Sequence, residues 1–330
     1  MGILKNRHLL PKLRGLTRTT TGSACTNDIG AQEYSAKSRT GAGASSHTFL
    51  QKFRRGSVVV ASIGADVADG GYATLGTCDA SGLALNSLGS GGAGDDGTLH
   101  ALCLGWNNEY LFNSLPQEVR AYFHDAKIVR GRVTSAGAEG LSSGKFSVSL
   151  ANTSEYTITF TPAFARTPIV IPTIIGTSAG SWKITAVSAS SVTIKTFDTS
   201  GLATAAAFDF VAYGSGAPNE IGLANADIFV PGLKNEIIGG VFNGSASTIS
   251  IGSVDYSFVK NSTGDYTLTF SRPFVDEPVV LLCGTSGRVQ LKSTPLKTAF
   301  TVVSFNAAGV AADDAGVHFQ VYGSFDNIEI

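Results

Sequence analysis

Two acidic clusters, each followed by a histidine, contain the residues of this chain that are best suited to chemistry. The first consists of Asp95, Asp96 and His100, and the second of Asp313, Asp314 and His318. Carboxylate oxygens are good ligands for Ca²⁺ and imidazole nitrogens for transition metals, so each cluster could hold a divalent cation. An aspartate pair close to a glycine, here Gly97 and Gly316, is also typical of a turn that leads into a strand. We favour the turn, and no metal or other cofactor is expected.

Two further patterns could belong to an enzyme, and neither has the surroundings that catalysis needs. The glycine-rich segment 89–94 lacks the helix that follows a phosphate-binding loop, because a strand is expected at 100–104. A nucleophilic serine or cysteine needs a histidine with an orienting acid, and the five histidines lie in no such motif. We therefore predict that the chain is not an enzyme.

A tryptophan next to a lysine is the best candidate for a binding site. Trp182 precedes Lys183, and Arg288 occupies the corresponding region about 110 residues later. Sugar rings present apolar faces that stack on exposed tryptophans, while polar side chains bind the sugar hydroxyls. The candidate glycan contacts are therefore Trp182, Lys183 and Arg288. The alternative interpretation places Trp182 in the core or at an interface.

The first 18 residues form a basic arm. Its cations are Lys5, Arg7, Lys12, Arg14 and Arg18. Five cations over this length are few for binding nucleic acid, whereas arginine pairs well with carboxylates on a protein surface. These five residues are therefore predicted to anchor the chain in an acidic groove of a partner protein.

A repeat of about 110 residues supplies the elements that must position these side chains. The segments 155–160 (EYTITF) and 265–270 (DYTLTF) alternate apolar residues with threonine, as strands with one buried face do. Continuous apolar runs follow at 169–171 and 279–282 and predict strands buried on both faces. A diverged copy near 49–60 completes three tandem domains of one kind. The phenylalanines that recur with the repeat, and that we expect in the cores, are Phe160, Phe164, Phe270 and Phe274.

The predicted fold class is all-β, with three tandem antiparallel β-sandwich (jelly-roll-like) domains, a basic N-terminal arm and one short linker helix. The predicted boundaries are 1–18 for the arm, 19–112 for the first, diverged sandwich, 113–216 for the linker helix and second sandwich, and 217–330 for a linker and the third sandwich. The helix is expected at 118–127, because Ser114, Pro116 and Gln117 have the types and spacing of a helix start.

The composition narrows the classes of partner. Hydrophobic residues make up 43% of the chain, and the net charge of −1 argues against binding to nucleic acid through its phosphates. No run of about 18 apolar residues is present, so no membrane-spanning segment is expected. The four cysteines follow no repeat and are interpreted as free thiols, with a Cys78–Cys103 bridge as the alternative.

The third repeat contains a recognisable order of motifs. Phe242-Asn243-Gly244 is followed by a short strand and by the segment 261–270 (NSTGDYTLTF). This order resembles a module of bacteriophage tail fibres and other virion proteins, and the prolines that follow resemble the start of H-type lectin and C1q-like sandwich domains. The resemblance extends over 236–325, is less complete over 128–216, and is weakest over 45–106. In the second repeat Ser154-Glu155 replaces the Gly-Asp of the motif.

The resemblance implies a small β-sandwich that trimerises on a virion, and it implies no catalytic residues. We therefore expect a phage virion structural protein, most simply a tail fibre or fibre-like appendage that acts in assembly and host-surface recognition after assembly in the host cytoplasm. Its expected partners are other virion proteins through the arm, two further copies in a homotrimer, and a host surface glycan. The alternatives are a capsid head decoration or cement protein, and a glycan-binding adhesin. A pseudo-threefold arrangement within one chain is the alternative to the homotrimer.

Overall fold

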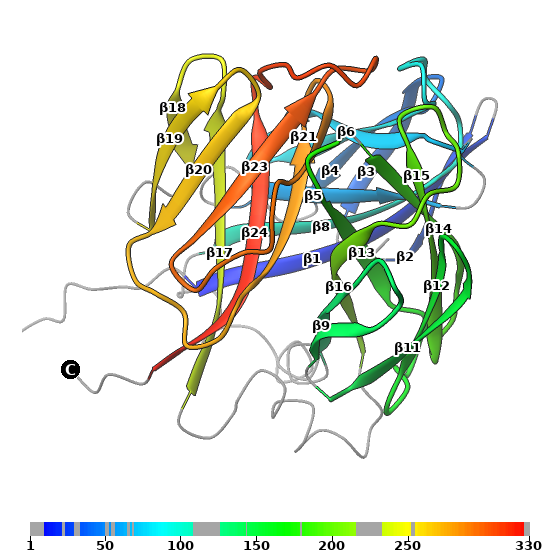
Figure 1. Cartoon of the computed structure of the whole chain (residues 1–330). Coiled ribbons are helices and arrows are strands. Elements are labelled where there is room, and N and C mark those ends of the chain that lie inside the picture. The colour runs from blue at the N-terminus through cyan, green and yellow to red at the C-terminus, as the bar shows by residue number, and fades with distance from the viewer. Residues whose placement is uncertain are drawn as a thin grey trace, which may run out of the picture.

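The chain is built from β-strands throughout the part that the computed structural model describes. The described residues are 10–21, 24–29, 34–49, 53, 57–64, 67, 69–107, 126–142, 144–178, 180–215, 233–251 and 255–326. They form 24 strands, and no helix occurs among them. The predicted all-β fold class is therefore confirmed (Figure 1).

The strands fall into three consecutive groups of eight, which we call the first, second and third sandwich. The first contains β1 (Leu10–Thr21), β2 (Ala24–Ile29), β3 (Tyr34–Gly41), β4 (Ala44–Phe49), β5 (Val58–Ile63), β6 (Tyr72–Cys78), β7 (Gly82–Leu88) and β8 (Thr98–Asn107). The second contains β9 (Ala126–Val133), β10 (Glu139–Ser142), β11 (Phe146–Asn152), β12 (Glu155–Phe160), β13 (Ile169–Ile175), β14 (Gly180–Val187), β15 (Ser191–Asp198) and β16 (Ala207–Ser215). The third contains β17 (Leu233–Asn243), β18 (Thr248–Ile251), β19 (Tyr256–Ser262), β20 (Asp265–Phe270), β21 (Val279–Gly284), β22 (Arg288–Leu291), β23 (Ala299–Phe305) and β24 (Val317–Asp326).

The three groups share one strand order. In the first sandwich one sheet has the order β2-β1-β8-β5 and the other β3-β4-β7-β6, and adding eight or sixteen to each number gives the pairings of the second and third. Pairing within each group is antiparallel. A parallel contact between Ile175 and Leu291 joins a sheet of the second group to a sheet of the third. The common order supports the interpretation of three tandem domains, which stays a prediction.

Each of the second and third groups encloses an apolar core between its two sheets, as a β-sandwich does. The phenylalanine pairs predicted for the cores are buried, which confirms that prediction. Phe160 and Phe164 stack edge to face with ring centroids 5.0 Å apart, and Phe270 and Phe274 do so at 4.8 Å. Each buried phenylalanine stabilises the fold by about 1.5–3 kcal/mol through its removal from water.

The three sandwiches pack around a shared core at the centre of the molecule. Strands β5, β13 and β21 hold equivalent places in their sheets, and each contacts the other two. Figure 1 shows the three groups, coloured blue to cyan, green, and yellow to red, gathered around these strands. One apolar cluster draws its residues from all three, among them Val59, Ile171 and Leu281. The uninterrupted burial predicted for the apolar runs at 169–171 and 279–282 is thus confirmed, because one face of each run packs in the core of its own sandwich and the other face in the shared core.

The same backbone hydrogen bond recurs at one turn in each of the three sandwiches. The amides of Ser87, Thr196 and Ser304 donate to the carbonyls of Gly43, Ser154 and Gly264, respectively. Gly264 has a positive φ of 68°, and a Cβ atom there would lie 2.6 Å from the Ser304 carbonyl oxygen. This close approach requires glycine, whereas Ser154 fits because the second hairpin does not place it at positive φ.

The structure differs from the predicted arm, and most of the predicted helix and the start of the predicted linker lie outside the described residues. Residues 10–18 of the predicted arm are not a separate segment, because they lie in β1 and pair with β8 of the first sandwich. Pairing with β8 gives the backbone N–H and C=O groups of β1 hydrogen-bond partners that a free arm would find only in water. Residues 118–125 of the predicted helix lie outside the described residues, and Ala126 and Lys127 belong to β9 instead. The linker predicted from residue 217 also lies outside the described residues as far as residue 232, and β17 begins at Leu233.

Candidate functional site at the junction of the sandwiches

Polar side chains at the centre of the molecule connect each sandwich to the next. The backbone amide of Val59 in the first sandwich donates to Nδ1 of His318 in the third, at 3.2 Å. The amide of Val280 in the third donates to Oδ2 of Asp209 in the second, at 3.1 Å. These bonds join backbone groups of β5 and β21 that face a neighbouring sandwich. Because the groups are buried, leaving such an amide unpaired would cost about 1–3 kcal/mol.

The two residues that accept these bonds, His318 and Asp209, occupy one structural position, and His100 holds that position in the first sandwich. In the strand register His100 lies opposite Ser62, Asp209 opposite Thr173, and His318 opposite Cys283. These three partners are the fifth residues of β5, β13 and β21, respectively. Their sequence spacing is 109 residues at each step. This constant spacing is the signal in the sequence that relates the three positions.

Asp209 forms the buried ion pair of the junction. Its carboxylate accepts from Nε of Arg132 at 2.7 Å, and the Asp209 side chain is fully buried. Nη1 of Arg132 also donates to Glu277 of the third sandwich at 2.8 Å. Burial raises the pKa of Asp209, while the hydrogen bond from Arg132 acts in the opposite direction. The guanidinium therefore holds a carboxylate and joins the second sandwich to the third.

The acidic cluster Asp313-Asp314 stabilises loops of the third sandwich. Asp313 accepts from the amide of Gly264 at 2.9 Å and from the hydroxyl of Tyr266 at 2.9 Å. Asp314 accepts from the amides of Thr285, Ser286 and Gly287, which fits the turn interpretation.

The first acidic cluster also stabilises a turn, but the aspartate that accepts the glycine amide is the second of its pair and not the first. Asp96, and not Asp95, accepts from the Gly43 amide at 2.8 Å and pairs with Arg39. Among the described residues, no group of three or more His, Cys, Asp or Glu side chains is placed to hold a metal ion.

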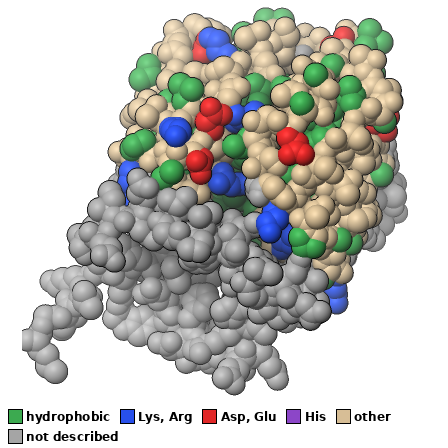
Figure 2. Space-filling view, turned by 60° about the horizontal axis from the view of Figure 1, so that its bottom comes forward, with side chains coloured by type: hydrophobic (Ala, Val, Ile, Leu, Met, Phe, Trp, Pro, Cys, Tyr) green, Lys and Arg blue, Asp and Glu red, His purple; other side chains and the backbone are tan. Residues whose placement is uncertain are grey.

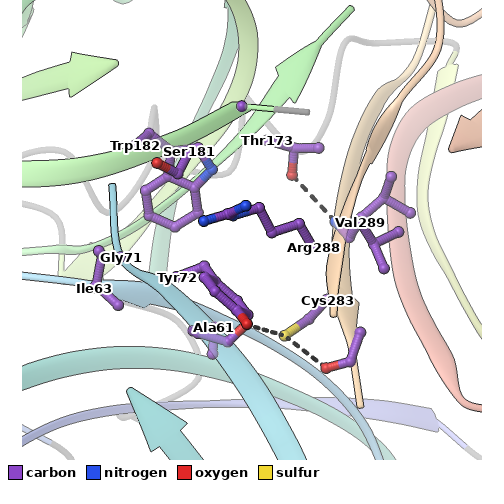
Figure 3. Close-up of a pocket in the computed structure, with 14 residues that line it drawn as sticks. Ala61, Ile63, Gly71, Tyr72, Thr173, Ser181, Trp182, Cys283, Arg288 and Val289 are labelled. Atoms are coloured by element: carbon purple, nitrogen blue, oxygen red, sulfur yellow. Dashed lines mark hydrogen bonds between the residues drawn. The ribbon is translucent and has the colours of Figure 1, made fainter. Parts of the chain in front are cut away.

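A small cavity of about 40 Å³ lies where the three sandwiches meet. It is lined by β5 and β6 of the first, β13 and β14 of the second, and β21 and β22 of the third. Two of the predicted glycan contacts, Trp182 and Arg288, line this cavity together. Figure 3 shows the Arg288 side chain reaching from β22 toward Ser181 and Trp182, with the Tyr72 ring on its other side. A cavity of this volume holds about three water-sized particles, so a sugar ring does not fit inside.

The strand register identifies which cavity residues are equivalent. Tyr72 pairs with Leu88, Ser181 with Phe197, and Arg288 with Phe305. Each of these partners is followed by an isolated bridge to an alanine or glycine six residues later, so the three positions correspond. The counterpart of Arg288 in the second sandwich is therefore Ser181, and not Trp182 as the sequence comparison suggested. Three equivalent positions with different side chains converge on one cavity.

The remaining predicted contact residues lie elsewhere or outside the described part. Lys183 forms an ion pair with Asp69 of the first sandwich and lies 5.8 Å from the centre of the Phe197 ring. Of the predicted anchoring residues, Lys12, Arg14 and Arg18 lie in β1, and Lys5 and Arg7 lie outside the described residues. Cys78 and Cys103 are free thiols, so the alternative disulfide does not form.

Figure 2 shows one face of the molecule, on which Lys, Arg, Asp and Glu side chains are intermixed over the described part. The described part of this face therefore presents no cluster of one sign that would attract a polyanion. No helix among the described residues is long and apolar enough to cross a membrane.

Comparison with known proteins leaves the chain without a match. No protein-family model, no curated protein and no solved structure matches it.

Proposed function

We propose that the chain is a structural protein of a bacteriophage virion that is monomeric before assembly and decorates the capsid head. One observation favours this function over a fibre: the three sandwiches of a single chain already surround a shared core. The resembling module is expected to trimerise, and here the two neighbours of each sandwich come from the same chain. The homotrimeric tail fibre predicted from the sequence would need further trimer contacts on the outer surface.

The proposed role involves contact between surfaces and no bond-making step. The hydrogen bonds of four aspartate carboxylates support this role. Asp96, Asp209, Asp313 and Asp314 each accept hydrogen bonds from backbone or side-chain donors. A catalytic carboxylate needs a face directed toward substrate, whereas these four stabilise hairpins and the junction of the sandwiches. Binding to other virion proteins through the N-terminal residues belongs to the same proposal.

Immunogold electron microscopy tests the proposal on virions assembled from the genome that encodes this chain. We expect antibodies against the chain to label the capsid head, and virions that lack the chain to lose their DNA at a lower temperature. Labelling along the tail would replace the decoration role by the fibre role. Absence of the chain from purified virions would overturn the proposal as a whole.

A further inference from the structure

We propose that the cavity at the junction of the sandwiches binds a small monovalent anion, of the chloride class, between Arg288 and Ser181. The inference does not depend on the proposed virion role. It starts from a buried positive charge: Arg288 is 3% exposed, and no carboxylate among the described residues forms an ion pair with it. A buried charge without a counter-charge is strongly unfavourable, so such groups are normally paired.

The protein partners of Arg288 are neutral and leave one of its three nitrogens without a hydrogen bond. Nη1 donates to the Ala307 carbonyl at 3.1 Å, and Nη2 donates to the carbonyls of Gly70 at 3.2 Å and Ser90 at 3.0 Å. The guanidinium carbon lies 4.7 Å from the centre of the Tyr72 ring. Nε is buried and has no hydrogen-bond partner. Three carbonyls and a ring face orient the guanidinium, and its net charge stays uncompensated.

A second unused donor lines the same cavity. The hydroxyl of Ser181 is buried and also has no hydrogen-bond partner, although Ser181 is 3% exposed. It comes from the second sandwich, at the position that corresponds to Arg288 in the third. Two buried donors that converge from equivalent positions, one of them cationic, form an arrangement that suits an anion. The cavity thus has the charge and the donors of an anion site.

The volume of the cavity limits the ligand. A space of about 40 Å³ accommodates about three water-sized particles, since one water needs roughly 10–15 Å³ by this measure. A chloride, bromide or nitrate ion is within this limit, and a phosphoryl sugar or a nucleotide is far beyond it. Because the lining residues belong to all three sandwiches, a bound ion would stabilise their assembly in proportion to its binding.

Thermal unfolding of the full chain measures this linkage. Sodium chloride is varied against sodium gluconate at constant ionic strength, so that only the small anion changes. Above the dissociation constant, each tenfold rise in chloride is expected to raise Tm by about 2–4 °C. Ser181→Ala is expected to weaken this response and Arg288→Gln to abolish it. Arg130→Gln is the matched control, because Arg130 also donates across sandwiches, to the Tyr322 carbonyl, and should leave the chloride response unchanged.

Crystals grown in bromide locate the ion even if Arg288→Gln fails to fold. We expect an anomalous bromide peak within hydrogen-bonding distance of Arg288 Nε and Ser181 Oγ in the wild type, and a weaker one in Ser181→Ala. A wild-type Tm that is the same in chloride and gluconate, together with no bromide peak in the cavity, would overturn the proposal and leave water as the occupant.

Discussion

Replacing Arg132 by methionine is expected to lower the free energy of unfolding by about 3–5 kcal/mol, because the substitution leaves Asp209 as a buried carboxylate without its cation. Asp209 is fully buried, and it also accepts from the Val280 amide of the neighbouring sandwich. Loss of Arg132 removes the bond to Glu277 as well. Urea unfolding measures the loss, and hydrogen exchange at the Val280 amide reports whether the junction between the second and third sandwiches opens.

Two further variants separate the unpaired charge from a loss of packing. Arg132→Met combined with Asp209→Leu removes both charges, so it is expected to be more stable than Arg132→Met alone. Arg39→Met provides a matched control, because Arg39 pairs with Asp96 at the surface, where water screens the interaction. Arg132→Met should therefore be much the more damaging of the two single changes. Equal losses for Arg132→Met and Arg39→Met would show that the junction ion pair does not hold the sandwiches together.

Lowering the pH from about 6.5 to about 4 is expected to destabilise the fold through His318. Burial lowers the pKa of this imidazole to about 4, although Asp314 nearby acts to raise it. In the unfolded chain its pKa is about 6.5, so below that value the unfolded chain takes up a proton that the folded chain does not. The contribution of His318 is thus fully present above pH 6.5 and is lost as the pH falls to about 4. The difference between the two pKa values corresponds to about 3 kcal/mol.

The geometry gives the reason why the folded chain resists this proton. Nδ1 of His318 accepts the Val59 amide, and a protonated imidazole has no acceptor to offer. His318→Asn keeps an acceptor and removes the titration, so its unfolding free energy should depend less steeply on pH between 6.5 and 4, by about one proton. Surface carboxylates titrate in both proteins and cancel in the comparison. Parallel pH profiles for the wild type and His318→Asn would contradict the assignment.

The strands could be predicted from the sequence because their signals are local. Alternation in 155–160 and 265–270 reports which face of a strand is buried, and the continuous apolar runs report burial on both faces. The arrangement around a shared core could not be predicted in the same way. The second face of a fully apolar strand can be covered by another sheet, by another chain, or by two neighbouring domains of the same chain. The choice depends on contacts between residues more than 100 positions apart, such as Ser62 with the Val170 carbonyl.

The junction site was predicted only in fragments. Trp182 and Arg288 were selected for glycan binding and lie together, but around a cavity too small for a sugar ring. Ser181 and Tyr72 were missed, because neither residue type is unusual and their equivalence appears only in the strand register. The anion-binding arrangement combines three positions whose side chains differ in the three sandwiches, so the repeat itself gives no signal for it.

The mass of the intact chain in solution tests the central claim, that the chain is monomeric because it supplies all three members of the shared core itself. Analytical ultracentrifugation over a wide range of protein concentration gives this mass directly. We expect a single species near 34.1 kDa, because β5, β13 and β21 already bury one another within the chain. A stable species of three times that mass would contradict the account, since it would show that trimer contacts lie on the outer surface as well.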